Sequence, residues 1–524
     1  MIALVLILVG SARIVATYTV FNHTSDEPAH IACGMEWLDK GTFRWEPLHP
    51  PLARVAAALG PYLLGIRSQG TNPAIRYALL HEGTAILYRD HHYDLTLALA
   101  RLGILPFFWI ACGVVYWWGK RSFGEAAAVL AVFLFSVLPP ILAHAGLATT
   151  DMAPTALLGA AFVCGLIWLE QPNRRTALWF GATSGLMVLS KFSCLGFFPA
   201  CAGVALVGYL ALERPALATL WPAVRRRVPT FAAALLVACL VVWAGYRFSF
   251  GKPEFSRMAL PAPELFDGIQ AAVHHFVHGH PAYLLGESRE LGWWYFFEVA
   301  LAVKTPLAFL ILAGIGVVVA WRERRSGQRA WLPLAYSIGV LAIGAWSHTN
   351  IGIRHVLPVY TGLALLGGIA CARMLEIAET QKWAPAGLAV LVLWLGWSSA
   401  AIHPDYLAYF NELAGDHPEN ILVDSDLDWG QDMKRLSKRL QEAGAKEVAF
   451  VPTLIADFEK EHGFPPIHGM DVLRPSHGWN AVGMALWKKD RMGLGKTHPE
   501  VTPWADRIPP QERIGKSILL WYFP

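Results

Sequence analysis

The sequence predicts an all-α polytopic membrane protein that ends in a small extracytoplasmic α/β appendage. Of its 524 residues, 55% are hydrophobic and only 16% are charged, and the mean hydropathy is +0.40. Soluble domains carry about 25% charged residues, so this composition indicates a chain that lies largely in lipid. Apolar runs recur up to residue 402, whereas polar and apolar residues mix in the segment 403–524.

Eleven apolar segments are candidates for membrane spans, because a helix crosses the hydrocarbon core with about 20 residues. They cover residues 2–20, 98–118, 125–143, 152–169, 177–190, 194–212, 230–248, 297–320, 331–347, 356–372 and 384–402. The first segment lacks a charged leader and a small-residue cleavage site, so we expect a retained span rather than a signal peptide.

Five clusters of basic residues lie in short loops between these spans, and all five loops fall on the same side of the membrane. They are Lys120 and Arg121; Arg174 and Arg175; Arg214, Arg225, Arg226 and Arg227; Arg322, Arg324, Arg325 and Arg329; and Arg373 and Lys382. Since cytoplasmic loops are enriched in Lys and Arg, we expect a cytoplasmic N-terminus in the plasma (inner) membrane. The segments 21–97, 249–296 and 403–524 then lie outside the cytoplasm.

Two domains follow from this division, a transmembrane domain over 1–402 and an extracytoplasmic domain over 403–524. In the second, the pattern predicts a strand at Asn420–Val423, a helix at Gln431–Ala443 and a strand at Glu447–Val451. Strand and helix in alternation are typical of a small α/β unit.

The first external segment opens with two adjacent carboxylates, Asp26 and Glu27, just beyond the first span. Like charges held together near a membrane surface raise a pKa, which prepares a general base. The alternative is structural, because Ser25 or Asp26 can cap a helix that holds Pro28 in its first turn. The two interpretations are compatible.

Further motifs follow the acidic pair along the chain. They are Glu46–Leu52 (EPLHPPL), Asp151, Gly185–Lys191 (GLMVLSK), Tyr283–Gly286 with Gly292–Phe296, Lys304-Thr305-Pro306 and Arg354–Pro358. In this order, and on one side of the membrane, they resemble the protein O-mannosyltransferase family. More broadly the chain resembles GT-C glycosyltransferases of family 39, in the bacterial, phospholipid carrier-dependent form. The similarity extends over most of residues 20–410 and implies a GT-C-like catalytic domain.

The resemblance implies an inverting glycosyltransferase that moves a sugar from a polyprenyl-phosphate carrier to an acceptor hydroxyl outside the cytoplasm. Asp26 is then the catalytic base, and Glu27 orients the acceptor or shares that task. A leaving phosphate needs positive charge in a low-dielectric site. The candidate substrate-binding residues are His49, Arg101, Asp151, Lys191, Lys304, Arg354 and His355.

Five of these candidates also have a structural interpretation. Arg101 and Lys304 stand near span ends, where basic side chains commonly reach toward the interface. Arg354 precedes a span and can anchor it, and Asp151 can cap the helix that begins after it. His49 can fix its loop by a hydrogen bond.

The resemblance also implies the substrates of the reaction and leaves the cofactor open. The donor is a polyprenyl-phosphate-linked hexose, mannose or pentose, and the acceptor is a protein, lipid or glycan of the cell envelope. A divalent cation, Mg²⁺ or Mn²⁺, is left open as a cofactor. A net charge of +4 gives no reason to expect a nucleic-acid partner.

The chain departs from the eukaryotic mannosyltransferases in two ways. Those enzymes carry a β-trefoil in the central external loop, for which 249–296 is too short, and their histidine follows the acidic pair one residue earlier. A transporter or flippase for a lipid-linked or anionic solute is the alternative function. It is disfavoured because a transporter distributes polar groups through the midplane, whereas these candidates gather at one face.

Two clusters outside these motifs have the residue types of metal sites. His274 and His278 stand at i,i+4, but no carboxylate completes a zinc set. The segment Asp424–Gly430 is similar to the start of a calcium loop, but its glycine falls one place late and Arg435 occupies the bidentate position. We therefore expect no metal site in either, and interpret the second as a capped helix or an acceptor-contacting loop.

Overall fold

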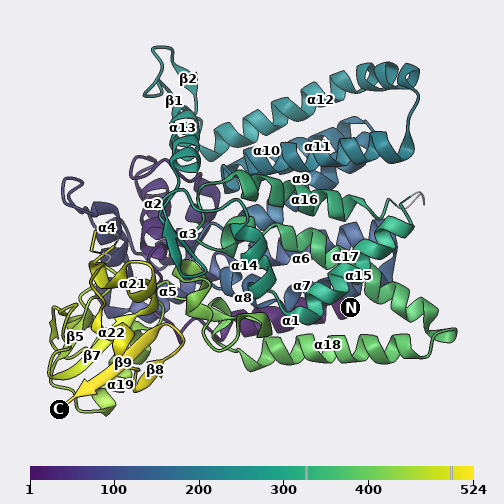
Figure 1. Cartoon of the computed structure of the whole chain (residues 1–524). Helices are drawn as coiled ribbons and strands as arrows, with labels where there is room; N and C mark the ends of the chain where they lie inside the picture. Colours follow the sequence, from purple (N-terminus) through teal and green to yellow (C-terminus); the bar gives the residue numbers. More distant parts are fainter. Residues whose placement is uncertain (325–328, 496, 499) are drawn as a thin grey trace.

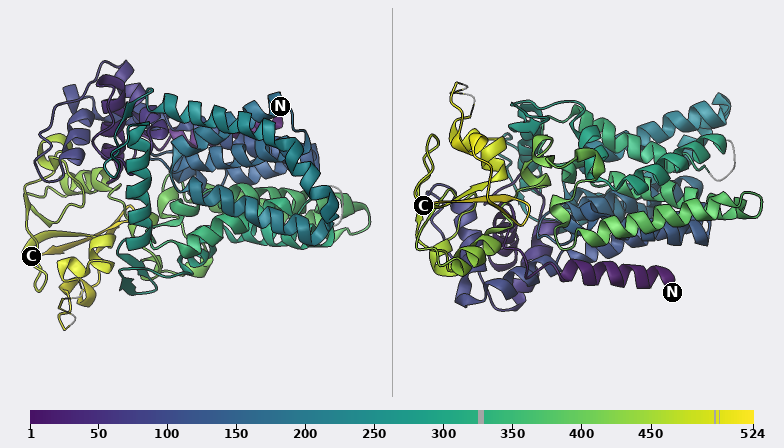
Figure 2. Two further views of the ribbon diagram at one scale, coloured as in Figure 1. Left: turned by 90° about the horizontal axis from the view of Figure 1, so that it is seen from above. Right: turned by 60° about the horizontal axis from the view of Figure 1, so that its bottom comes forward.

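The computed structural model describes residues 1–324, 329–495, 497–498 and 500–524, so the predicted basic residue Arg325 lies outside the described residues. Long helices run side by side, and the shorter elements α2, α3, α4, α13 and the tail gather at one end of them (Figure 1). Two further views agree with this arrangement, with the N-terminus toward the opposite end (Figure 2). We call the first end the tail end.

All eleven predicted segments are helical. The helices are α1 (Ile2–Val15), α5 (Tyr93–Leu102) and α6 (Leu105–Phe123), α7 (Glu125–Ser136) and α8 (Pro139–Ala145), α9 (Met152–Glu170), α10 (Arg174–Ser190), α11 (Cys194–Glu213), α12 (Leu217–Gly245), α14 (Phe296–Lys304) and α15 (Leu307–Arg322), α16 (Leu332–Trp346), α17 (Val359–Glu376) and α18 (Trp383–Ala401). Within the described chain, six helices are long and apolar enough to cross a membrane, and two bent pairs raise this number to eight. The chain is therefore an integral membrane protein.

Two predicted spans are broken rather than continuous. The segment 125–143 bends by 67° between α7 and α8, and the segment 297–320 bends by 116° between α14 and α15. Prolines stand at both breaks, Pro139 and Pro306, and a proline removes one backbone donor and disfavours helical geometry in the residue before it. The prediction of one straight span at 297–320 was wrong. The break brings Lys304 to the end of a short helix at the tail end.

The helices differ in what surrounds them. Most of α9 and α17 is buried against other helices, whereas most of α11, α12 and α18 is exposed and apolar, as expected for helices that face lipid. Small residues let the inner helices approach closely. A Cβ atom on Gly316 of α15 would lie 2.1 Å from the carbonyl oxygen of Leu366 in α17, so glycine is required at this crossing.

The segment 21–97 folds into three helices, α2 (Glu27–Asp39), α3 (Pro51–Leu63) and α4 (Ala78–Leu87), followed by the 3₁₀ turn η1 (Arg89–His91). The segment 249–296 contains the hairpin β1 (Phe250–Gly251) and β2 (Leu260–Pro261), the helix α13 (Pro263–His278) and the hairpin β3 (Ala282–Leu284) and β4 (Glu287–Arg289). The short helix η2 (Ile353–Val356) precedes α17 and η3 (Ile377–Glu379) follows it, so the span predicted at 356–372 begins slightly later.

The tail contains a five-stranded sheet within its described residues, in the order β6-β5-β7-β9-β8. Its elements are η4 (Tyr406–Ala408), η5 (Glu412–Ala414), η6 (Pro418–Asn420), η7 (Asp424–Asp426), α19 (Met433–Glu442), β5 (Val448–Phe450), α20 (Phe458–His462), β6 (Ile467–His468), β7 (Gly478–Gly483), α21 (Met484–Lys488), η8 (Arg491–Gly493), α22 (Trp504–Arg507), β8 (Glu512–Ile514) and β9 (Ile518–Phe523). β5 pairs in parallel with β6 and β7, and β9 pairs antiparallel with β7 and β8.

The predicted helix and second strand of the tail are confirmed as α19 and β5, and so is the small α/β appendage. The predicted strand at Asn420–Val423 was wrong, because this segment is irregular. Its Leu422 belongs to the same hydrophobic core as the membrane helices, together with Tyr406 and Ala414. The first part of the tail is thus packed into the membrane domain rather than into the sheet.

Candidate active site

The acidic pair divides its two carboxylates between different surroundings. Asp26 is the N-cap residue of α2 and Pro28 lies in the first turn, as the structural interpretation predicted. The Asp26 carboxylate, however, forms no capping hydrogen bond with any described amide of the helix. It points instead to Arg354, whose Nη1 donates to Asp26 Oδ2 at 3.1 Å.

Glu27 is completely buried and surrounded by donors. Arg101 donates to it through Nε at 2.8 Å and Nη2 at 2.9 Å, and the backbone amides of Thr24 and Ala148 each donate at 2.8 Å. Burial raises the pKa of Glu27, but the pairing with Arg101 and the two amides outweighs burial, so the pKa lies below its ordinary value. Glu27 is therefore an ionised carboxylate with its oxygens occupied.

Arg354 connects Asp26 to a second buried carboxylate, Asp151. The Arg354 Nη1 atom lies 3.7 Å from Asp151 Oδ2, and Lys191 Nζ donates to Asp151 Oδ1 at 2.6 Å. Asp151 is the residue before α9, and Lys191 is the extended residue that ends α10 before α11 begins. We call Asp26, Asp151, Lys191 and Arg354 the ionic network.

Within the ionic network only Asp26 is open to solvent. Its side chain is 37% exposed, compared with 8% for Lys191 and Arg354 and 0% for Asp151. A molecule that enters from the tail end can therefore reach the Asp26 carboxylate, while the two cations remain in a low-dielectric environment. Charges act more strongly in such an environment than in water.

Three histidines near the ionic network have a free ring nitrogen. His49 Nδ1, His144 Nδ1 and His355 Nε2 are buried and have no hydrogen-bond partner among the described residues. Burial, followed by the charge of Lys191, lowers the pKa of His49 to about 3 and that of His355 well below its ordinary value. The rings of His49 and His355 are therefore neutral, and each can donate one N–H without adding charge.

The loop that carries His49 is held by Arg54 of α3, a fully buried side chain. Arg54 pairs with the Glu46 carboxylate and donates to the carbonyl oxygens of Glu46 and His49 at 2.8 Å and 3.1 Å. The two prolines that follow, Pro50 and Pro51, begin α3. The loop is thus fixed, and the ring of His49 meets the ring of His30 edge-on, with the two centroids 5.4 Å apart.

The structure does not bring Arg101 or Lys304 into the ionic network. Arg101 is 1% exposed and donates to Glu27 and to the carbonyl oxygens of Tyr18 and Asn22. Lys304 donates to the carbonyl oxygens of Leu407 at 2.8 Å and Asp426 at 2.5 Å. Both cations therefore join segments of this chain, and their side chains do not extend to the interface as snorkelling would require.

Two tail residues outside the predicted set of site residues complete the surroundings of Arg354. Its Nε donates to Ser425 Oγ at 3.0 Å, and its guanidinium lies 4.2 Å over the ring centroid of Trp429. Trp429 also meets the ring of His144 edge-on, with the two centroids 6.3 Å apart. Both residues belong to Asp424–Gly430. The sequence signal for this segment was its acidic composition, which is similar to the start of a calcium loop.

Neither cluster with metal-site residue types offers a set of ligands. No group of three or more His, Cys, Asp or Glu side chains that could hold a metal ion occurs among the described residues. The rings of His274 and His278 stack on one another with centroids 3.9 Å apart. In the ionic network the carboxylates already have cationic partners, which leaves no free carboxylate set for a divalent cation.

Comparison with known proteins identifies the fold. Residues 100–246, which include Asp151 and Lys191, match the family model described as dolichyl-phosphate-mannose-protein mannosyltransferase. ArnT from Cupriavidus metallidurans bound to undecaprenyl phosphate has a TM-score of 0.51 and 13% identity, over 99% of this chain and 97% of that chain. The apo state of ArnT covers the same shares at 13% identity, with a TM-score of 0.50.

A third similar structure is the archaeal oligosaccharyltransferase AglB from Archaeoglobus fulgidus, in complex with an inhibitory peptide and a dolichol-phosphate. It has a TM-score of 0.49 and 13% identity, over 84% of this chain and 58% of that chain. No curated protein sequence matches the chain. The similarity to ArnT extends over the whole length of both chains, and the chain therefore has the GT-C membrane fold that its motifs predicted.

Proposed function

We propose that the chain is an inverting glycosyltransferase that moves a sugar from a polyprenyl-phosphate carrier to an acceptor hydroxyl. One observation carries the proposal. A partly exposed carboxylate, Asp26, stands beside the buried cation Arg354, and Asp151 connects Arg354 to a second buried cation, Lys191. A fold similar to that of ArnT brings these residues together from distant parts of the chain. Sugar transfer from a lipid phosphate needs a base and buried positive charge at adjacent positions.

The cations bind the carrier phosphate in this proposal. Arg354 and Lys191 are held by Asp26 and Asp151, so their charge is fixed in place before the substrate arrives. Neutral His49 and His355 supply N–H donors on the same side. Preorganised donors in a dry site stabilise developing charge without a reorganisation cost at the moment of reaction.

The transfer itself needs one proton movement and one displacement. The acceptor hydroxyl gives its proton to the Asp26 carboxylate while its oxygen bonds to the anomeric carbon. The bond between that carbon and the phosphate oxygen breaks, and its electron pair leaves with the phosphate toward Arg354 and Lys191. Attack opposite the leaving group inverts the anomeric configuration.

The cationic side chains take the role that a divalent cation would otherwise have. Asp26 and Asp151, the two carboxylates of the ionic network, are occupied by Arg354 and Lys191. The residues present do not fit the Mg²⁺ or Mn²⁺ cofactor left open by the sequence, and we assign it no step.

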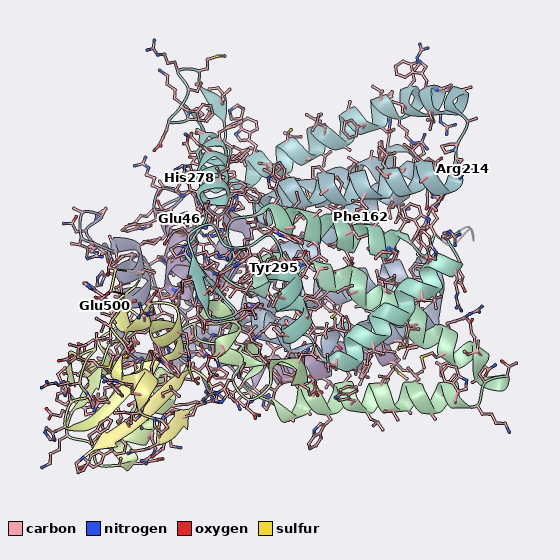
Figure 3. The ribbon with its side chains drawn as sticks, viewed as in Figure 1. Glu46, Phe162, Arg214, His278, Tyr295 and Glu500 are labelled. Atoms are coloured by element: carbon pink, nitrogen blue, oxygen red, sulfur yellow. The ribbon has the colours of Figure 1, made fainter. Side chains whose placement is uncertain are left out.

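The proposal puts the active site on the extracytoplasmic side of the inner membrane. Glu46, which lies in the segment that carries the active-site loop, and the loop residue Arg214 lie at opposite ends of the molecule (Figure 3). Arg214 belongs to the basic residues that favour the cytoplasm. The carrier is then a polyprenyl phosphate such as the undecaprenyl phosphate bound to ArnT, and the acceptor is a protein, lipid or glycan hydroxyl of the cell envelope.

The test is transfer of labelled sugar from a panel of polyprenyl-phosphate hexoses and pentoses into membranes that contain the protein. The wild type should consume at least one donor, and the product should have the inverted anomeric configuration. Asp26→Asn should lose transfer, whereas the matched control Asp416→Asn, at an exposed tail position, should retain it. A wild type that consumes no donor in the panel, but takes up a lipid-linked solute, would support the transporter alternative instead.

A further inference from the structure

The segment Asp424–Gly430, which we call the strap, leaves the tail and lies against the ionic network. We propose that the strap is a positioning element of the donor site, in which Ser425 and Trp429 hold the Arg354 guanidinium in the plane that receives the carrier phosphate. The inference rests on the proposed function, and it makes the tail a structural part of the active site.

Arg354 is restrained on three sides. Trp429 supports the face of the guanidinium at 4.2 Å, Ser425 accepts from Nε at 3.0 Å, and Asp26 accepts from Nη1 at 3.1 Å. A planar guanidinium binds phosphate through paired N–H donors, so its orientation decides whether both donors reach the oxygens. The remaining nitrogen, Nη2, donates to no residue in the described chain, which leaves it for a ligand.

Besides the hydrogen bonds of Ser425 with Arg354 and with the Ile351 carbonyl oxygen, further hydrogen bonds join the strap to the membrane domain. The Asp426 carboxylate accepts from the Ile353 amide at 3.0 Å, and the Asp426 carbonyl oxygen accepts from Lys304 at 2.5 Å. The Trp429 carbonyl oxygen accepts from the Ser25 amide at 3.1 Å. The Gly430 carbonyl oxygen accepts from the Asn22 side chain at 2.7 Å. Two of these contacts involve Ile353 and Ser25, which precede Arg354 and Asp26 in the chain. The strap therefore fixes the position of the proposed base relative to the cation.

The strap is equally fixed to the tail. Asp428 accepts from the Ala485 amide at 2.9 Å, and Lys489 pairs with Asp424 at 2.5 Å. The strap therefore connects the tail to the membrane domain, because it has hydrogen bonds with both. This bridging explains why Lys304, expected near the phosphate, is directed toward the backbone of residue 426.

The surroundings of Gly352 show how closely the strap packs against the membrane domain. Its φ is +142°, and a Cβ atom there would lie 2.3 Å from Ser425 Oγ. Such a position favours glycine, because other residues rarely adopt this backbone conformation. An alanine at 352 would push Ser425 away from Arg354 without removing any polar group, which gives a second way to disturb the strap.

The experiment compares Trp429→Ala, Trp429→Phe and Gly352→Ala with Trp479→Ala, a tail control on β7. For each purified variant we would measure the thermal midpoint, binding of labelled undecaprenyl phosphate, and KM and kcat for the donor. Loss of the ring should raise the donor KM and the dissociation constant of undecaprenyl phosphate about tenfold, since a desolvated cation–π contact has that order of strength. Trp429→Phe keeps a ring face and should bind within about threefold of wild type.

Gly352→Ala should weaken binding in the same direction as Trp429→Ala, and Trp479→Ala should leave it unchanged. The acceptor KM should stay constant in every variant, because a merely destabilised tail would change both substrates. Unchanged donor binding in a folded Trp429→Ala protein overturns the role of the strap, and so does equal loss in Trp479→Ala. A wild type that neither binds undecaprenyl phosphate nor transfers sugar overturns the proposed function as well, so the two failures are distinguishable.

Discussion

Two carboxylates that are neighbours in the sequence lie in opposite kinds of ion pair. Glu27 and Arg101 form a closed pair, in which both side chains are buried and all oxygens of the acid have donors within the chain. Asp26 and Arg354 form an open pair, with a partly exposed acid and a guanidinium shared among Asp26, Asp151 and Ser425.

The difference teaches how one acidic motif can serve structure and chemistry together. Asp26 and Glu27 are adjacent at the start of α2, so their side chains point in different directions around the helix. One direction leads into the junction of the first external segment with α5, and the other leads to the solvent side of the ionic network. The closed pair holds the start of α2 in place, and this in turn fixes the position of the Asp26 carboxylate.

Breaking the closed pair should have the largest effect on the protein. Glu27→Ala leaves Arg101 buried without its counter-charge, and removal of one partner of a buried pair costs about 3–5 kcal/mol. We expect the thermal midpoint in detergent and the yield of folded protein to fall sharply. Glu442→Ala, an exposed position in α19, is the control and should unfold like wild type. A stable but inactive Glu27→Ala protein would instead place Glu27 in the chemistry.

Breaking the open pair should affect turnover and spare the fold. Asp26→Asn removes the proposed base, and a positioned base is worth about 10²–10⁴ in rate. Because Asp26 is partly exposed, the thermal midpoint should stay close to that of wild type. Steady-state transfer and thermal unfolding measured on one preparation check this prediction. Loss of folded protein on this substitution would contradict the contrast between the two pairs.

Removing Lys191, the second cation of the ionic network, should give a smaller loss of turnover. Lys191→Met deletes the charge that pairs with Asp151, and loss of one group that stabilises a leaving anion costs about 10²–10³ in kcat. We expect the loss in donor turnover rather than in acceptor KM. Lys120→Met changes an exposed lysine at another helix end and should transfer at the wild-type rate. Equal rates for both variants would exclude Lys191 from the site.

The pH dependence of stability should report the closed pair. The pKa of Glu27 is below its ordinary value of 4.5, so its contribution is fully present above about pH 4.5 and is lost as the pH falls through the folded-state pKa. As the pH is lowered below about 4.5, the thermal midpoint should therefore decline more steeply in wild type than in Glu27→Gln. Parallel curves for the two proteins would mean that Glu27 is not held ionised.

Chelation of divalent cations should have the smallest effect. With Arg354 and Lys191 as the charges of the site, transfer should stay within about twofold after treatment with EDTA. The measurement is the rate of labelled transfer before and after chelation. Loss of transfer that Mg²⁺ or Mn²⁺ restores would move the role of these side chains to a bound metal.

The sequence predicted the membrane fold, and it predicted that the candidate site residues lie on one side of the membrane. Helical span length and loop charge are local properties, so the eleven helical segments could be located before their packing was known. All four members of the ionic network were among the predicted site residues. Lys191 and Arg354 were selected by their predicted positions at span ends, and the resemblance supplied Asp151 and the role of Asp26.

What the sequence could not give was the partner of each charge. Arg101 and Lys304 have the same signal as Lys191, a cation at a span end, and only the packed structure shows that they bind carbonyl oxygens and Glu27. The break at Pro306 had a local signal that the span-length argument overrode. The apolar run before Asp424 looked like a strand, but tertiary packing claimed Leu422 for the membrane domain.

The strap also sets an order of events during synthesis. It follows every membrane helix in the chain, and chains emerge from their N-terminal ends. If the strap orients Arg354 as proposed, a nascent protein with all its spans inserted still lacks the Ser425 and Trp429 contacts, so the orientation of Arg354 depends on the later folding of the tail against the membrane domain.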